Sequence, residues 1–521
     1  MKKLPIGVYT FSKMIEEDHL YVDKTQHILT LIDSGKYYFL SRPRRFGKSL
    51  LVSTLKEIFS GHKELFQGLF IYDKIEWTPY PVVHLDCSRI DHASPEALQH
   101  GLLDFLHGIN ESHALQIKPS GFRWYFTSIL EALAAKYGQR VVVLIDEYDK
   151  PIIDHTDDLP TAKANRKILK DFYGALKAGD AHLQFVLLTG VSKFSQVSVF
   201  SDLNNLNDIS IFSKYASLLG YTQTELEHYF TEYLQQFSAV KNIPMDDLLR
   251  RIKRWYNGYS WDGEQTVYNP FSILNLFEKQ QFNDYWFATG TPTFLLEQIK
   301  QSDVATTEFE NKQVSGLVFD SYDLERMNVF ALLFQAGYLT ITDVHEDEDG
   351  VLYTLNYPNL EVKNAFLTHL LESLSSQRLD EIHTTVRTLK QHLHNGDVDE
   401  FINIVQALFA KIPYTLHIEK EAYYHSLFYM IAALMGVDIE LEVLTDKGRI
   451  DGVLECEDKI YIIEFKYGRP GSDSDTLAQN AIQQIRKKQY AERYQNDARP
   501  RVLLGIGFTG KEIGYQLVEN E

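Results

Sequence analysis

One short stretch near the start of the chain decides the fold: Tyr37-Tyr38-Phe39-Leu40-Ser41-Arg42-Pro43-Arg44-Arg45-Phe46-Gly47-Lys48-Ser49. Its opening apolar run predicts a buried β-strand, and the residues that follow predict a helix over Leu50–Ser60. Phosphate binding needs this order, because backbone N–H groups at a helix N-terminus face the anion. A lysine adds a mobile charge, and a serine hydroxyl ligates Mg²⁺. Gly47, Lys48 and Ser49 therefore predict a site for the phosphates of a nucleotide.

The loop departs from the usual phosphate-binding pattern at Arg42, which stands where a glycine is expected. Guanidinium groups bind phosphate oxygens through paired hydrogen bonds, so Arg42, Arg44 and Arg45 would compensate for that glycine. We expect these arginines and the adjacent Phe46 to contact the nucleotide, and we expect the basic stretch to serve nucleotide phosphate rather than nucleic acid. A helix start with an exposed lysine is the plain alternative for the loop taken alone.

A second motif strengthens the nucleotide interpretation. The β-branched run Val141–Ile145 ends in two carboxylates, Asp146 and Glu147. In phosphoryl transfer the first acid would hold Mg²⁺, and the second would polarise the attacking water. A polar strand end that faces solvent is the alternative for this pair. Because the loop and the acids occur in the expected order, we interpret them as one nucleotide site.

Two further apolar runs extend the expected sheet. Val82–Asp86 supplies the extra strand expected in a site of this kind, and Phe185–Thr189 supplies a fourth strand. Thr189, Ser192 or Lys193, at or just beyond the end of that fourth strand, would sense the γ-phosphate. An ordinary strand-to-loop transition explains each of these three residues equally well.

The predicted strands and helices divide the chain into four parts. Strands alternate with helix-length stretches over residues 36–215, which predicts an α/β domain with a parallel sheet. A helix over Leu324–Tyr338 that ends near Gly337, followed by two strands, Leu339–Asp343 and Val351–Asn356, predicts a small winged-helix unit. The expected domains are a P-loop domain at 1–215, a helical lid at 216–315, a winged-helix and helical linker at 316–411, and a second α/β domain at 412–521.

Composition excludes several classes of protein. The 521 residues carry 52 Lys and Arg against 71 Asp and Glu, and the net charge of -19 opposes sliding on nucleic acid. No apolar run reaches the ~18 residues that span a bilayer, and the N-terminus lacks the apolar core of an export signal. Two cysteines favour buried free thiols in a reducing compartment. We expect a cytoplasmic protein with no membrane contact, and the sequence does not specify its oligomeric state.

A predicted β-hairpin near the C-terminus carries acids on one face. A two-residue turn over 457–458 places Asp451 opposite Glu464, with their Cβ atoms ~5 Å apart. Two carboxylates that close repel unless a cation lies between them, which is a geometry that Mg²⁺ uses. Lys466 points to the same side, where its ammonium would orient a water or stabilise a pentavalent phosphate. A slip of one residue in register would separate these side chains, and a plain exposed strand is the alternative.

Two predicted helices add polar groups to the same face. The apolar stripe that follows Glu421 at helical spacing places this acid one turn away, facing the sheet. A helix from about Thr476 to Tyr494 carries Gln484 along one flank, from which its amide would reach the same site. Solvated polar groups on helix surfaces are the alternative for both residues.

Several segments of the first half resemble the bacterial AAA-ATPase-like family, whose members commonly carry a C-terminal nuclease-like domain. The segments are Tyr21–Thr25, Arg42–Ser49, Asp146–Pro151, Thr189–Ser195, Phe200–Leu206, Trp255–Tyr259 and Tyr285–Gly290. The resemblance covers roughly residues 4–290 and implies a P-loop NTPase domain of the AAA type that binds ATP.

A set of polar residues in the second half resembles the metal site of the PD-(D/E)XK nuclease superfamily: Glu421, Asp451, Glu464, Lys466 and Gln484. The resemblance implies a restriction-endonuclease-like fold and Mg²⁺-dependent hydrolysis of a nucleic-acid phosphodiester. The two strand acids would be metal ligands, and the lysine would position the nucleophile. We expect an ATP-dependent switch or motor coupled to a nuclease. The alternative is a nucleotide-gated scaffold that binds nucleic acid or protein without cutting it.

Overall fold

The computed structural model describes most of the chain in two compact units. The first unit comprises Met1–Gln298 and Asn311–Val362, and the second comprises Ile299–Glu310 and Lys363–Glu521. Among the described helices, none is both long and apolar enough to cross a lipid bilayer. The described residues are 1–193, 205–287, 295–296, 298–299, 304, 306–319, 328–375, 378–410, 421–436, 438–445, 448–456, 458–468, 471–509 and 512–519.

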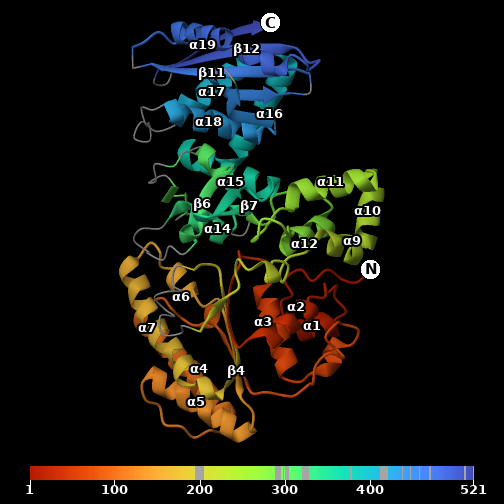
Figure 1. Ribbon diagram of the computed structural model, residues 1–521, viewed down its shortest axis with the longest axis vertical. Coiled ribbons are helices and arrows are strands. Elements are labelled where there is room, and N and C mark those ends of the chain that lie inside the picture. The colour runs from red at the N-terminus through yellow and green to blue at the C-terminus, as the bar shows by residue number, and fades with distance from the viewer. Residues whose placement is uncertain are drawn as a thin grey trace. The chain divides into compact units, whose positions relative to one another are not determined.

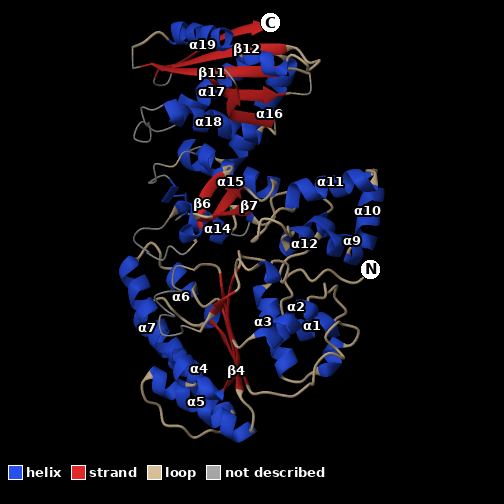
Figure 2. Cartoon of the chain, in the orientation of Figure 1, coloured by secondary structure: helices blue, strands red, loops and turns tan. Residues whose placement is uncertain are grey.

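A parallel β-sheet with helices on both faces forms the N-terminal part of the first unit. Its elements are β1 (Tyr37–Ser41), β2 (Val82–Asp86), β3 (Val141–Asp146), β4 (Leu183–Gly190), β5 (Asn207–Asp208), α1 (Phe11–Glu16), α2 (Thr25–Ser34), α3 (Lys48–Phe59), α4 (Pro95–Ser112), α5 (Phe122–Tyr137), α6 (Lys150–Ile153) and α7 (Leu159–Ala178). Every residue of β1 and β3 is buried, because α3 covers one face of the sheet and α4, α5 and α7 lie on the other (Figures 1 and 2). The predicted α/β domain with a parallel sheet is confirmed.

The strand order in this sheet is β2-β3-β4-β1-β5, which the sequence did not predict. The strand β4 lies between the loop strand β1 and the acid-bearing strand β3, and β2, the predicted strand Val82–Asp86, lies on the far side of β3. The order of strands along the chain does not fix their order in space, and both runs are apolar enough for an inner position. Thr189 pairs with Leu40 near the end of this middle strand, so it lies between the loop and the acids.

Helices follow the sheet, as the sequence predicts for this part of the first unit. They are α9 (Gln223–Tyr229), α10 (Thr231–Lys241), α11 (Met245–Tyr256) and α12 (Pro270–Lys279). Thr222 and Glu225 form a reciprocal capping box that begins α9. Buried apolar side chains hold the four helices together, among them Leu226, Phe230 and Ile252.

A small antiparallel sheet and one helix complete the first unit. They are β6 (Lys312–Ser315), β7 (Thr340–Asp347), β8 (Gly350–Asn356) and α14 (Val329–Ala336), and the strand order is β6-β8-β7. The helix begins later than predicted, because the Asn328 side chain accepts the backbone N–H groups of Phe330 and Ala331. It ends at Gly337 as predicted, where φ is 93°. The prediction lacked β6.

The second unit contains a five-stranded sheet with strand order β13-β12-β11-β10-β9. Its elements are β9 (Asp438–Thr445), β10 (Gly448–Glu455), β11 (Ile460–Gly468), β12 (Arg501–Thr509), β13 (Glu512–Glu519), α16 (Leu379–Asn395), α17 (Val398–Ala410), α18 (Glu421–Leu434) and α19 (Ser474–Lys488). A further helix, α15 (Leu360–Ser375), begins in the first unit and continues in the second. Figure 2 shows α19 on one face of the sheet and α17 and α18 on the other. The predicted hairpin corresponds to β10 and β11, and the sequence analysis did not identify the two edge strands, β9 and β13.

Glycines allow α19 to lie close to the sheet. A Cβ at Gly505 would overlap the carbonyl oxygen of Ala478, and one at Gly507 would overlap that of Ser474. The helix ends at Lys488, earlier than the predicted Tyr494, because Gln489 adopts a left-handed backbone with φ of 52°. This close approach and early end determine which side chains α19 presents to β11.

Candidate functional site

The phosphate-loop prediction falls on the turn between β1 and α3. Gly47 has φ of 93° and forms the N-cap position of α3, so that the helix begins at Lys48. The Lys48 ammonium donates to the carbonyl oxygens of Arg42 and Pro43 at 2.9 and 3.0 Å. Burial lowers the pKa of Lys48, while the nearby carboxylates of Asp146 and Asp149 oppose that shift. The lysine therefore closes the loop across the space in front of the helix N-terminus.

Arg42 lies away from that space, contrary to the expectation that it contacts phosphate. Its side chain is 1% exposed and donates to the carbonyl oxygens of Ser41, Ser210 and Tyr215 at 2.9, 2.5 and 3.3 Å. Its guanidinium also lies 3.9 Å from the ring centroid of Trp261. Burial lowers its pKa to about 9. Because its guanidinium donates to backbone carbonyl oxygens, this arginine stabilises the loop and does not face the phosphate site.

The other predicted loop residues divide between the surface and the core. Arg44 and Arg45 are exposed, and the Arg45 guanidinium lies 4.3 Å from the ring centroid of Phe271. Phe46 is 1% exposed and packs edge-on against Tyr259 and Trp261, at centroid distances of 4.8 and 5.3 Å. The two exposed arginines are free to face a ligand, whereas Phe46 anchors the loop.

The predicted acids lie at the end of β3. The Thr189 hydroxyl of β4 donates to Asp146 Oδ1 at 2.5 Å, and the backbone N–H of Glu147 donates to the same oxygen at 3.1 Å. Glu147 adopts a left-handed backbone with φ of 51°, which is costly for a residue other than glycine. Burial and the adjacent Asp146 charge raise the pKa of the Glu147 carboxyl. The structure thus brings Thr189 and both acids together.

Asp149 is a residue of this site to which the sequence assigned no role. Its buried carboxylate accepts the backbone N–H of Val191 at 3.1 Å and the N–H and hydroxyl of Ser192 at 2.7 and 2.8 Å. Lys193 pairs instead with Asp208 at 2.6 Å. Ser192 and Lys193, the other candidates for sensing phosphate, are therefore held by protein partners, and the loop after β4 is fixed to the strand of acids.

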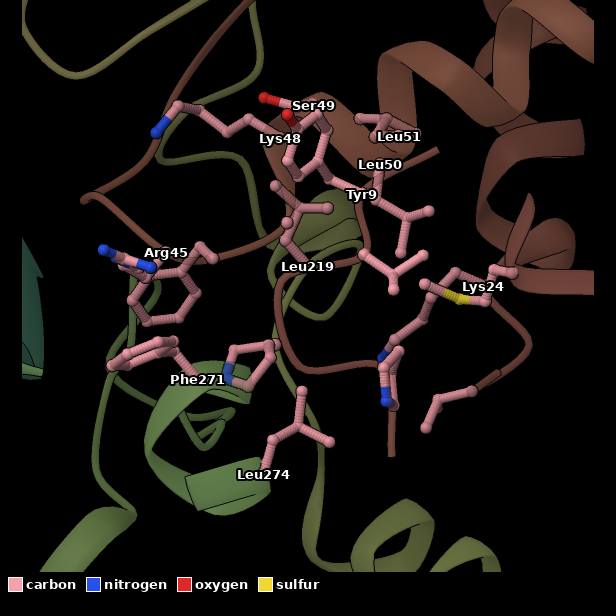
Figure 3. Close-up of a pocket in the computed structure, with 18 of the residues that line it drawn as sticks. Tyr9, Lys24, Arg45, Lys48, Ser49, Leu50, Leu51, Leu219, Phe271 and Leu274 are labelled. Carbon is pink, nitrogen blue, oxygen red and sulfur yellow. The ribbon is translucent and has the colours of Figure 1, made fainter. Parts of the chain in front are cut away.

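A cavity of about 430 Å³ lies between the phosphate loop and Glu147, and its volume is in the range of small-molecule sites. Figure 3 shows the charged ends of Lys48 and Arg45 on the same side, with Leu219 and Leu274 among the apolar side chains around them. The phosphate-site residues that line it are Arg44, Arg45, Phe46, Gly47, Lys48, Ser49 and Glu147. Its apolar walls come from Ile6, Val8, Tyr9, Met14, Leu218, Leu219, Phe271 and Leu274.

The sequence analysis missed the N-terminal wall of this cavity. Residues 5–9 line it beside the start of α3, although they precede the sheet by a long stretch of chain. Gly7 has φ of 75°, so a proline and a glycine around one apolar residue mark a turn here. The sequence therefore indicates a turn at these residues, but their position beside the phosphate loop depends on the fold.

The second predicted site lies on β10, β11 and α19. The hairpin register is confirmed, because Gly452 pairs with Ile463 and Glu455 with Ile460. Asp451 Oδ2 accepts the backbone N–H of Phe465 at 2.8 Å. This pairing puts Asp451 across from Glu464, the residue beside Phe465.

Glu464 is the centre of this second cluster. Its carboxylate is 1% exposed and accepts from the Lys466 ammonium at 2.8 Å and from the Gln484 amide. Tyr490, which sequence reasoning missed, lies beside them: burial raises the pKa of its phenol, the Glu464 charge adds to that shift, and a hydrogen bond with Gln484 opposes it. The helix end at Lys488 turns this tyrosine inward. The side chain of Glu421, at the start of α18, lies outside the described residues.

Comparisons with known proteins agree with this division of the chain. A family described as "Predicted AAA-ATPase" matches residues 5–200, and the PD-(D/E)XK nuclease superfamily matches residues 419–516. A relative from Azotobacter chroococcum mcd 1, named "Uncharacterized protein in vnfD 5'region", is 39% identical over 518 residues, which is 98% of this chain and 96% of the relative. The chain belongs to the predicted AAA-ATPase family.

Each of the two family matches contains one of the two candidate sites. The first match contains the loop of β1 and α3 together with the acids of β3. The second contains the acids of β10 and β11 and the amide of α19. Among the side chains that the structure describes, no three His, Cys, Asp or Glu groups converge as a metal site.

Proposed function

We propose that this protein binds and hydrolyses ATP in its first unit and couples that reaction to a Mg²⁺-dependent nuclease-like domain acting on nucleic acid. The cavity carries the proposal, because it joins the N-terminus of α3 and Glu147 to an apolar wall. The charged end suits phosphates, and the apolar end suits a purine base. We further propose residues 1–215 as the ATPase domain and 412–521 as the nuclease domain, in a cytoplasmic protein.

In the proposed ATP site, each side chain has a distinct task. Lys48 would exchange the loop carbonyls for the β- and γ-phosphates, while Arg44 and Arg45 bind outer oxygens. The Glu147 carboxylate would accept the proton of the attacking water, and a raised pKa makes it a better base. Ser49 and Asp146 would hold Mg²⁺, which neutralises developing phosphate charge when it is bound.

The nuclease-like cluster has the donor chemistry that Mg²⁺ requires. Two carboxylates on adjacent strands, Asp451 and Glu464, offer hard oxygen donors, and one of them is fully buried. Bound Mg²⁺ would polarise a phosphodiester. Lys466 would then release Glu464 and turn its ammonium to the nucleophile, while Gln484 orients the buried carboxylate. Glu421 would add a further polar group from α18.

A matched set of cleavage assays tests this function. Purified wild type is incubated with a panel of single- and double-stranded DNA and RNA, with and without ATP and Mg²⁺. We expect cleavage that needs Mg²⁺, changes with ATP, is lost in Asp451→Asn, and loses its ATP response in Lys48→Ala. If wild type binds nucleic acid but cuts nothing under any nucleotide condition, the chain is a nucleotide-gated scaffold.

A further inference from the structure

Two stretches that resemble the family take no part in the chemistry described above: Trp255–Tyr259 and the described part of Tyr285–Gly290. Both lie within the first unit, near the start of α15. Gly258 has φ of 117°, and a Cβ there would overlap the carbonyl oxygen of Pro358. Only glycine permits this approach, so the first stretch is fixed against the residues that lead into α15.

Trp286 belongs to the second stretch and bonds in two directions. Its indole N–H donates to the carbonyl oxygen of Arg44 in the phosphate loop at 3.1 Å. Its backbone N–H donates to Glu361 Oε1 at 2.7 Å. One residue therefore joins the loop to the second residue of α15.

The carboxylate of Glu361 is enclosed at this junction. Its side chain is 0% exposed, and its other oxygen accepts the Ser272 hydroxyl of α12 at 2.7 Å. Burial raises the pKa of Glu361 to about 8, against the hydrogen bonds that favour its charged form. A carboxyl group this deeply buried depends on these donors, since losing one would leave a buried acceptor without a hydrogen bond.

A third contact ties the loop to the same junction. Gly337, at the end of α14, has φ of 93°, and a Cβ there would lie 2.7 Å from Pro43 Cβ and 3.2 Å from Trp286 Cζ2. The loop is thus held by packing at Pro43 and by a hydrogen bond at the carbonyl oxygen of Arg44. Phosphates that draw the Lys48 ammonium off the carbonyls of Arg42 and Pro43 would change this same segment of backbone.

We propose that Trp286 and Glu361 are positioning residues of the nucleotide site, which transmit nucleotide binding from the phosphate loop to the start of α15. The inference rests on the proposed ATP binding. Because α15 begins in the first unit and continues in the second, it connects the two units covalently, and the hydrogen bonds of Trp286 connect the loop to its start. In this proposal, Gly258 of the first stretch packs against Pro358 just before α15, and Trp286 of the second stretch bonds the loop to α15.

Hydrogen exchange on the full chain tests the route. Amide exchange is measured by mass spectrometry for peptides covering 356–366, with and without saturating Mg-ATP, in wild type and in Trp286→Phe. The substitution keeps the aromatic packing with Tyr338 but removes the indole donor. We expect ATP to slow exchange in this segment of wild type, and we expect the variant to lose that response while ATP affinity falls about threefold to tenfold.

A matched control separates this role from simple loss of a hydrogen bond. Trp77→Phe removes an indole donor to a backbone carbonyl, that of Tyr72 at 2.9 Å, elsewhere in the same unit, and it should leave the ATP response intact. Glu361→Gln provides a second variant should Trp286→Phe fail to fold. ATP binding without any change over 356–366, or an unchanged response in both variants, would overturn the inference. Absence of ATP binding by wild type would instead overturn the proposed function.

Discussion

Replacement of Arg42 by methionine separates a structural role from phosphate binding. The guanidinium makes two short hydrogen bonds to carbonyls, at 2.5 and 2.9 Å, and stacks on Trp261. Each charged bond contributes about 1.5 kcal/mol at the low end, and a desolvated cation–π contact about 1 to 2 kcal/mol. Apolar burial of methionine returns about 1 kcal/mol. We therefore expect a loss of roughly 3 kcal/mol in the free energy of unfolding of the first unit.

Denaturant unfolding followed by tryptophan fluorescence provides the assay, since all five tryptophans of the chain lie in the first unit. Arg44→Met is the matched control, because that side chain is exposed and should change stability by less than about 0.5 kcal/mol while weakening ATP binding. The reasoning is refuted if Arg42→Met unfolds at the wild-type denaturant concentration yet binds ATP tenfold more weakly.

Three further predictions concern separate parts of the molecule. Two proteins that both carry Asp284→Asn are compared, one with Glu361 and one with Glu361→Gln. The free energy of unfolding of the protein with Glu361 should fall relative to the other as pH rises from about 5 to about 8, because Glu361 keeps a proton in the folded state that it has released in the unfolded state. Unfolding measured as a function of pH tests this. Lys466→Ala should retain Mn²⁺ binding by calorimetry while losing cleavage, whereas Asp451→Asn should lose both. Gly505→Ala should destabilise the second unit by about 2 kcal/mol or more in thermal melts.

The sequence predicted those features that depend on neighbouring residues. The two-residue turn before Lys459 predicted the register of β10 and β11, and Gly337 marked the end of α14. The sequence did not determine the strand order. Val82–Asp86 and Phe185–Leu188 are both largely apolar, and only the packing of the folded protein determines which of the two strands lies inside the sheet.

The candidate sites show the same division between local and distant information. Lys48 and Ser49 were found from their place before a helix, and both line the cavity. Arg42 was predicted to bind phosphate but donates to the carbonyl oxygens of Ser210 and Tyr215. The sequence does not distinguish an arginine that binds backbone carbonyls from one that binds phosphate. Tyr490 was missed because the helix that was predicted to reach Tyr494 ends at Lys488.

Calorimetric titration of Mg-ATP tests the central claim most directly. The protein is titrated as wild type, Lys48→Ala and Glu147→Gln, and the hydrolysis of ATP is followed in parallel. The account predicts one ATP per chain for wild type, weak or no binding by Lys48→Ala, and binding without turnover by Glu147→Gln. Wild type that binds no nucleotide, or Lys48→Ala that binds it as tightly as wild type, would contradict the account.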